Sequence, residues 1–349
     1  MKSGGWVVAA AIAVATIAFA FHARDLVRHR ARPVGDGRRV ESYGFSLTSC
    51  RVQRELIVAS GMPKDGFKAL VDPPAWTTAQ ADAATTKYSK FLVAGDRVIG
   101  LQLNGQARAY PLRMLVWHEV VNDTVGGVAV AVTYNPLCDS AVAFRRDVRG
   151  QRFAFGMSGL LYDSNLLMYD RQPGAKGESL WSQLLFRAVA GPAAADGLAL
   201  DLLPISVETW ADWRREHPET TVLASDLEMA ERYASDPYTN YFGSDQLSFP
   251  VGRLPSPAGW PLKTPVVAIG GPGGWTAFPF PALASATGSL TSPPAPWTAL
   301  ASALSYRAQG PTVAVAADAL PPGARVVYAS YFAWYATHST DTEWVGAGR

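Results

Sequence analysis

The sequence predicts a β-rich α+β fold, in which antiparallel hairpins and short helices form two repeat-related halves. Three observations support this fold class. The 349 residues include 31 glycines and 25 prolines, which divide the chain by frequent turns. The 11 Trp, 13 Tyr and 14 Phe residues supply the large side chains that short strands favour. Residues 99–115 resemble residues 267–283, which indicates an internal repeat.

The composition also limits the function. Hydrophobic residues make up 48% of the chain and charged residues 17%, so we expect a sizeable buried core. The net charge is only +2, and much of the excess comes from arginines near the N-terminus. Because nucleic-acid binding needs a basic surface, we expect no nucleic-acid partner.

The N-terminus predicts a membrane-related segment at residues 1–23. Residues 6–21 carry no charge, and their length suits either a cleaved signal peptide or a membrane anchor (transmembrane helix). Ala18 and Ala20 provide the small-x-small pattern that a signal peptidase prefers. The basic linker that follows, residues 24–39, favours instead an anchored protein that faces the cytoplasm, because arginine-rich flanks tend to stay inside.

The next elements follow in order from hydrophobic runs and turn residues. Asn104-Gly105 predicts a hairpin over residues 96–110. Pro111 suits the first position of a helix that runs to about Val121. A second helix is expected over 207–216, capped by Ser206 or Thr209. Further strands are expected at 128–134, 141–145, 152–155 and 166–169.

The repeat predicts two tandem halves, a complete one at residues 40–235 and a reduced one at 236–349. In addition to the hairpin match, three residues of the first half align without gaps with three of the second. Gene duplication is the natural interpretation, and chance similarity between aromatic hairpins is the alternative. The aligned sets are Trp213, His217 and Thr221 with Trp334, His338 and Thr342.

Two segments carry a resemblance to a known family. They are residues 117–123, Trp-His-Glu-Val-Val-Asn-Asp, and residues 132–138, Val-Thr-Tyr-Asn-Pro-Leu-Cys. With flanking motifs, this pattern resembles domain-of-unknown-function family 3179 over nearly everything after the linker. The resemblance favours export to the periplasmic side, and it implies no reaction. The family often has cysteine where this chain has Asn135, so a CxxC redox pair is lost here.

His118 and Cys138 are the candidate metal-ligating residues, because imidazole and thiolate together suit a copper or zinc ion. They equally suit a nucleophile and its base. The structural alternative is a hydrogen-bonded histidine and a cysteine packed as a small apolar side chain. The residues predicted to surround the site or line its pocket are Asn122, Asp123, Tyr134, Met168, Asp170 and Trp181.

Two functional hypotheses follow. The first is an extracytoplasmic metal-binding or redox accessory protein that uses His118 and Cys138. The second is a non-catalytic binding or scaffold module, with an aromatic groove for a polymer or a partner protein. Cys50 and Cys138 either pair as a disulfide or stay free. The expected partner is the membrane, through the N-terminal segment.

Overall fold

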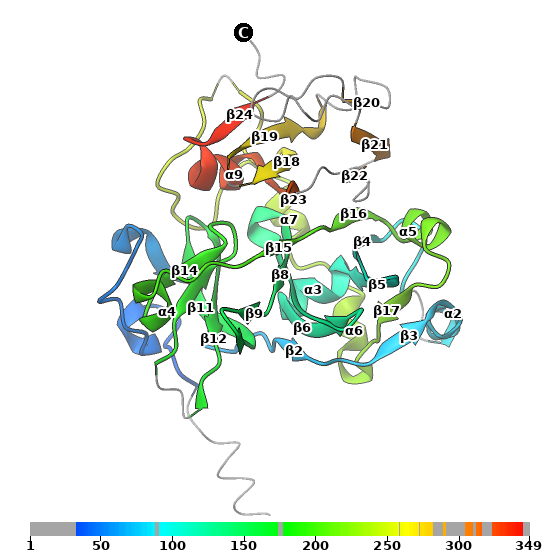
Figure 1. Ribbon diagram of the computed structural model, residues 1–349, viewed down its shortest axis with the longest axis horizontal. Coiled ribbons are helices and arrows are strands. Elements are labelled where there is room, and N and C mark those ends of the chain that lie inside the picture. The colour runs from blue at the N-terminus through cyan, green and yellow to red at the C-terminus, as the bar shows by residue number, and fades with distance from the viewer. Residues whose placement is uncertain are drawn as a thin grey trace, which may run out of the picture. The chain divides into compact units, whose positions relative to one another are not determined.

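The computed structural model describes residues 33–87, 91–173, 177–257, 259–271, 273–281, 289–290, 304–309, 312–315 and 323–344 (Figure 1). Residues 35–349 belong to one compact unit. Within the described ranges, no helix is long and apolar enough to cross a membrane. The predicted membrane segment, residues 6–21, lies outside them.

The described chain consists of many short strands and short helices. The α-helices are α2 (Thr78–Lys87), α3 (Leu112–His118), α4 (Pro192–Ala195), α5 (Trp210–Glu216), α6 (Ala230–Tyr233), α7 (Thr239–Phe242) and α9 (Tyr331–His338). Single 3₁₀ turns are η1 (Val40–Tyr43), η2 (Arg54–Leu56), η3 (Pro136–Cys138) and η5 (Leu227–Met229).

The strands of the first 223 residues are β1 (Ile57–Ala59), β2 (Leu70–Val71), β3 (Ala75–Thr77), β4 (Arg97–Leu103), β5 (Gln106–Pro111), β6 (Val120–Val125), β7 (Val128–Asn135), β8 (Ser140–Arg145), β9 (Asp147–Val148), β10 (Gln151–Arg152), β11 (Phe155–Tyr162), β12 (Asn165–Asp170), β13 (Leu180–Ser182), β14 (Arg187–Ala190), β15 (Leu202–Leu203), β16 (Ser206–Thr209) and β17 (Thr221–Leu223). The later strands are β18 (Pro265–Gly271), β19 (Gly274–Pro279), β20 (Ser289–Leu290), β21 (Leu304–Gln309), β22 (Thr312–Val315), β23 (Arg325–Ser330) and β24 (Thr342–Trp344).

Three larger sheets organise these strands. The largest has the order β2-β6-β7-β8-β23-β18-β19-β24, with β15 beside β8. A second sheet has the order β16-β4-β5-β17-β3, and a third has β1-β11-β12-β13-β14. Most neighbouring strands are antiparallel and joined by hairpins. The prediction of a β-rich α+β fold built of antiparallel hairpins is therefore confirmed.

The predicted hairpin at Asn104-Gly105 is present as β4 and β5. Both turn residues have positive φ, 48° at Asn104 and 80° at Gly105, which a tight two-residue turn between twisted strands requires. Strand pairing runs from Leu103 opposite Gln106 to Val98 opposite Pro111. This hairpin positions α3, which begins directly after Pro111.

Two predicted helix boundaries are wrong. The helix after Pro111 ends at His118 instead of about Val121, because Val120 and Val121 begin a strand that pairs along β7. The second helix begins at Trp210 instead of Val207, because residues 206–209 extend the sheet beside β4. In both cases the β-branched residues at the boundary gain strand partners, which outweighs their modest helix propensity. The cap at Thr209 is confirmed, since its hydroxyl accepts the Asp212 N–H.

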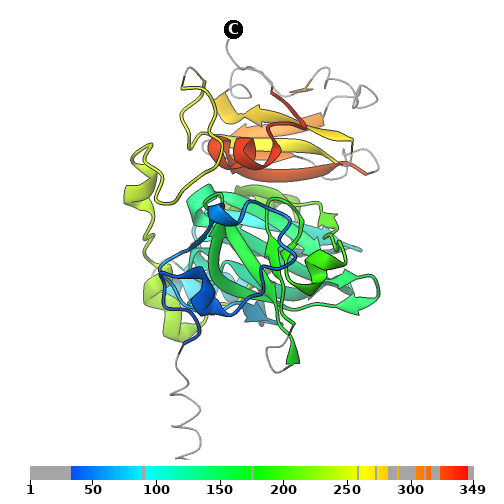
Figure 2. The same cartoon turned by 90° about the vertical axis from the view of Figure 1, so that its left-hand side faces the viewer.

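The two segments predicted to be repeats have the same strand order. In β16-β4-β5-β17 and in β23-β18-β19-β24, the first two pairings are antiparallel and the last is parallel. The register also corresponds, with Ile99 opposite Val207 and Val267 opposite Tyr328. Figure 2 shows α9, in red, lying against the strands of the second copy. Gene duplication, and the bounds 40–235 and 236–349, stay predictions.

A buried tryptophan follows β16 in one copy and β23 in the other. Trp213 in α5 is 3% exposed, and its Nε1 donates to Thr220 Oγ1 at 2.9 Å. Trp334 in α9 is fully buried, and its Nε1 donates to Thr342 Oγ1 at 3.1 Å. Trp213 thus joins α5 to the residue before β17, and Trp334 joins α9 to β24. Both rings fill the core beside the sheet.

Gly100 leaves the space that the Trp213 ring occupies. A Cβ atom at Gly100 would lie 2.2 Å from ring atoms of Trp213. We therefore expect Gly100→Ala to lower the free energy of unfolding by about 1–3 kcal/mol, because the ring must move within a packed core. Gly95→Ala is the matched control, since a Cβ atom there meets nothing within 4 Å. Urea unfolding of both variants checks this, and equal stabilities would contradict it.

Candidate functional site

The site residues lie where α3 passes into β6 and where β7 passes into η3. The two positions are adjacent, because the Tyr134 N–H donates to the Glu119 carbonyl at 2.8 Å. The Glu119 N–H donates to Leu115 O at 2.7 Å, which closes the last turn of α3. Glu119 itself has a φ of 52°, a left-handed conformation that side chains other than glycine rarely adopt. The helix end and the strand end of the two family-like motifs therefore meet at Glu119.

His118 is 4% exposed, and protein groups occupy both of its ring nitrogens. Nδ1 lies 2.8 Å from the Lys68 carbonyl oxygen, which only accepts, so Nδ1 carries the proton. Nε2 then accepts from the Tyr233 hydroxyl at 2.6 Å. Burial lowers the pKa of His118, so the ring is neutral at neutral pH. This is the structural arrangement that the sequence left open as an alternative.

Cys138 is fully buried in η3. Its Sγ donates to the Ser164 carbonyl at 3.4 Å, and its N–H donates to Asn135 Oδ1 at 3.2 Å. Burial, aided by the carboxylates around it, raises the pKa of the thiol above its usual range. Cys138 and Cys50 are both free thiols. A buried, protonated thiol is unreactive in this conformation.

His118 and Cys138 therefore direct their polar atoms at different partners. Among the described residues, no group of three or more His, Cys, Asp or Glu side chains is placed to hold a metal ion. A copper or zinc ion shared by these two residues stays a prediction.

Glu119 is the most unusual ionisable group of the site. It is 5% exposed, and the one hydrogen bond of its carboxyl within the described chain is from Asn135 Nδ2, at a long 3.4 Å. Burial raises the pKa of Glu119 to about 8, from an ordinary value of 4.5. The carboxyl is therefore mostly protonated at neutral pH. A raised carboxyl pKa with few fixed partners is typical of a functional group.

Residues 226–244, which we call the tyrosine segment, contact the two motifs from outside. They contain η5, α6 and α7, and α6 packs on α3 (Figure 1). Tyr233 binds His118, and the Tyr241 hydroxyl donates to the Leu137 carbonyl at 3.0 Å. The pKa of Tyr238 is raised by burial and by the nearby Glu119 carboxyl. One short segment thus places three tyrosines around the site.

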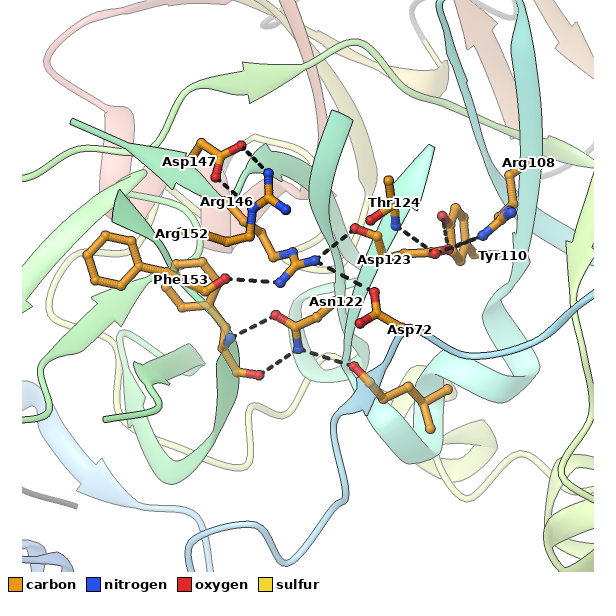
Figure 3. Close-up of polar contacts among 12 residues, drawn as sticks. Asp72, Arg108, Tyr110, Asn122, Asp123, Thr124, Arg146, Asp147, Arg152 and Phe153 are labelled. Atoms are coloured by element: carbon orange, nitrogen blue, oxygen red, sulfur yellow. Dashed lines mark hydrogen bonds and ion pairs between the residues drawn. The ribbon is translucent and has the colours of Figure 1, made fainter. Parts of the chain in front are cut away.

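Asp123 does not orient His118 but binds two residues of β5 (Figure 3). Arg108 Nη1 donates to its Oδ1 and Oδ2 at 2.7 and 2.6 Å, and the Tyr110 hydroxyl donates to Oδ2 at 2.8 Å. The Asp123 and Arg108 side chains are 5% and 11% exposed. Arg146 Nη2 donates to the Asp123 carbonyl at 3.1 Å. Asp123 therefore ties two sheets together through a buried ion pair.

Asn122 also has a structural role, in joining three strands (Figure 3). Its Nδ2 donates to the carbonyls of Leu70 and Phe155, at 3.1 and 2.8 Å. Its Oδ1 accepts the Phe155 N–H at 2.7 Å. Because the side chain is fully buried, these bonds satisfy all of its polar atoms away from water.

The other four predicted pocket residues are also buried. The Tyr134 hydroxyl donates to Asp139 Oδ1 at 2.8 Å, and Arg97 Nη1 donates to the same oxygen at 3.0 Å. Asp170 accepts the Ser179 N–H. The remaining two, Met168 and Trp181, belong with Cys138 to one hydrophobic cluster.

Three tryptophans that could supply an aromatic groove lie in the core instead. Trp181, Trp210 and Trp213 are at most 4% exposed. Trp181 packs edge-on against Phe153 and Phe155, with ring centroids 5.4 and 5.5 Å apart. They therefore offer no open surface for a polymer.

Sequence reasoning missed Glu119 and the tyrosine segment. Glu119 lies inside the family-like motif, where the sequence predicts a helix, and this prediction contains neither its left-handed backbone nor its burial. The three tyrosines at 233, 238 and 241 come from a stretch with no clear periodicity. The gathering of three tyrosines within residues 233–241 was the available signal.

A family model described as a protein of unknown function (DUF3179) matches residues 64–348. No curated protein and no solved structure matches the chain. The match contains every residue of the site and the whole tyrosine segment.

Proposed function

We propose that this chain, which belongs to the DUF3179 family of proteins of unknown function, is an extracytoplasmic protein in which the Glu119 carboxyl exchanges a proton with a bound molecule. The family assigns no activity, so the proposal is argued from the site. Asn135 holds the carboxyl, and the tyrosine segment covers it from water. The molecule is one whose leaving group needs a proton, such as an ester, a phosphoester or a glycoside.

The observation that supports this proposal is the bonding of Glu119. A carboxyl group has about four sites for hydrogen bonds, yet from the described residues this buried one receives a single long bond, from Asn135. Its backbone is left-handed, a strain that clusters at functional positions. The carboxyl thus has hydrogen-bonding capacity that the described residues do not use. A bound molecule is the partner that would use it.

The raised pKa gives Glu119 its chemical role. With a pKa near 8, the carboxyl is an acid at neutral pH and can donate its proton to an oxygen of the substrate. Asn135 donates to the carboxyl and stabilises the carboxylate that forms. His118 takes no part, because both of its nitrogens are bonded elsewhere.

A panel of chromogenic esters, phosphoesters and glycosides tests this role with the purified protein. We expect turnover of one class, with a rate that falls above pH 8 as Glu119 loses its proton. Glu119→Gln should lower that rate by about 10²–10⁴-fold. The control is Glu208→Gln, which alters a second buried glutamate, bound by the Ser206 hydroxyl at 2.7 Å. Turnover that survives Glu119→Gln, or no turnover of any class, would contradict the proposal.

The second candidate is a redox accessory role for Cys138. It is favoured by η3, where the Asn135 side chain accepts the N–H of Cys138 three residues later. The first thiolate of a CxxC motif at a helix start is stabilised in the same way. In this chain asparagine takes that position, so Cys138 acts as a single thiol. Reaction requires the tyrosine segment to move away, because the thiol is fully buried.

Asn135→Cys tests whether η3 is a thiol-exchange scaffold. We expect the variant to form an internal disulfide with Cys138 when treated with oxidised glutathione, which releases two molecules of reduced glutathione. Mass spectrometry of the non-reduced protein detects the loss of two hydrogens, and Asn135→Cys with Cys138→Ser is the control. A stable mixed disulfide with glutathione would show that the two sulfurs cannot meet.

The extracytoplasmic location rests on the apolar residues 6–21 and is opposed by the arginines of residues 24–39. Reporter enzymes fused after Arg349 test it, with one that works only outside the cytoplasm and one that works only inside. Activity of the second reporter alone would overturn the proposed location.

A further inference from the structure

A pocket of about 490 Å³ lies apart from Glu119, where four segments meet. Residues 50–53 form one wall, and the turn between β11 and β12 forms another. The turn before β14 and the end of α9 complete it. Its volume lies within the range of sites for small molecules.

The charges of the pocket are mainly positive. Arg51 and Arg187 line it and are exposed, and the buried Asp163 is its one carboxylate among the described lining residues. Arg51 is held in place, because its Nε and Nη2 donate to the carbonyls of Ala194 and Ala195 at 3.2 and 3.3 Å. The Arg187 guanidinium has no hydrogen bond or ion pair to any described residue. A fixed and an unengaged guanidinium in one pocket lining favour an anionic ligand group.

Asp163 provides a polar group of the opposite charge. Its side chain is 3% exposed, and its Oδ1 accepts the Gly252 N–H at 2.7 Å. The residue has a φ of 50° in the turn between β11 and β12, so the turn fixes its position. Tyr162, which also lines the pocket, hydrogen-bonds this carboxylate through its hydroxyl. A carboxylate has about four acceptor sites, so a hydroxyl or ammonium group of a ligand can use one that remains.

Aliphatic side chains complete the lining. Val52, Leu185 and Ala336 are half-buried at the pocket and come from three different segments. Phosphate or sulfate alone would leave these surfaces in water. A ligand with a hydrocarbon part would cover them, and removing this apolar surface from water favours binding.

We propose that this pocket binds a small aliphatic hydroxy acid or amino acid. Its carboxylate contacts the Arg51 and Arg187 guanidinium groups, and its hydroxyl or ammonium group donates to Asp163. Its aliphatic part lies against Val52, Leu185 and Ala336. The pocket lining does not include Glu119, Asn135 or any residue of the tyrosine segment. This proposal can therefore be tested independently of the acid–base function.

Cys50 provides a direct assay, because it lines the pocket and is half-buried. Iodoacetamide should alkylate Cys50 of the reduced protein and leave the fully buried Cys138 unmodified as an internal reference. We expect 2-hydroxyisocaproate and leucine to slow the alkylation of Cys50 in a saturable way. Isopentylamine, which lacks the carboxylate, and inorganic phosphate, which lacks the aliphatic part, should not protect it.

Arg187→Gln should weaken this protection by about 10-fold or more, since it removes a charge-assisted hydrogen bond to the ligand carboxylate. Arg145→Gln makes the same charge change at an exposed residue outside the pocket and should leave protection unchanged. Both variants should keep the melting temperature of the parent. Equal protection by isopentylamine or phosphate, no protection by either acid, or full protection of Arg187→Gln would each overturn the proposal.

Discussion

Asp123→Ala is expected to lower the free energy of unfolding by about 3–5 kcal/mol, because it leaves a buried arginine without its partner. Asp123 accepts both bonds from Arg108 Nη1 and a third from the Tyr110 hydroxyl. Without the carboxylate, the positive charge of Arg108 has no ion-pair partner, and its side chain is only 11% exposed to water. Urea unfolding followed by circular dichroism measures the loss.

The matched control is Asp82→Ala, which removes an exposed ion pair. Asp82 and Arg214 are joined by two hydrogen bonds of 2.7 and 2.8 Å, but their side chains are 52% and 40% exposed. Water replaces such a bond easily, so we expect a loss of about 1 kcal/mol or less. Similar losses in the two variants would mean that Asp123 does not stabilise the contact between the two sheets.

Glu119→Gln is expected to stabilise the protein at pH 7 by about 3 kcal/mol. The pKa of Glu119 is about 8 in the folded state against an ordinary 4.5. Between these pH values the unfolded chain loses the proton and the folded chain keeps it. Stability of the parent therefore falls with rising pH, by about 1.4 kcal/mol per pH unit from this residue. Glutamine cannot ionise, so the variant lacks this loss.

Unfolding measured from pH 4 to pH 8 checks the sign as well as the size. Parent and variant should be nearly equal at pH 4, where the carboxyl is protonated in both states, and should diverge as the pH rises. Glu41→Gln, which replaces an exposed glutamate, is the control and should follow the parent curve. Parallel curves for the parent and Glu119→Gln would show that Glu119 ionises normally in the folded protein.

The sequence predicted the fold where local chemistry decides the structure. Asn104-Gly105 strongly favours a two-residue hairpin turn, and this turn fixes the register of β4 and β5. The predicted helix boundaries are wrong at Val120 and Val207, because pairing with strands elsewhere in the chain determines the structure at those positions. Local propensity does not contain that information.

The candidate site was located only in part. The segments around His118 and Cys138 do meet, through the Glu119 carbonyl and the Tyr134 N–H. Their side chains could not be oriented from sequence, because the partners that hold them, Lys68, Ser164 and Tyr233, lie 26 to 115 positions away. Glu119 was missed for the same reason, since its raised pKa comes from burial by the whole fold.

Direct titration of the Glu119 carboxyl tests the central claim most closely. In NMR spectra of protein labelled with ¹³C in its glutamate side chains, the resonance that is missing from Glu119→Gln belongs to Glu119. Its chemical shift should change with a midpoint near pH 8, the value that burial beside Asn135 produces. A midpoint near 4.5, the ordinary value for glutamate, would show that the carboxyl is ionised at neutral pH and would contradict the acid–base function.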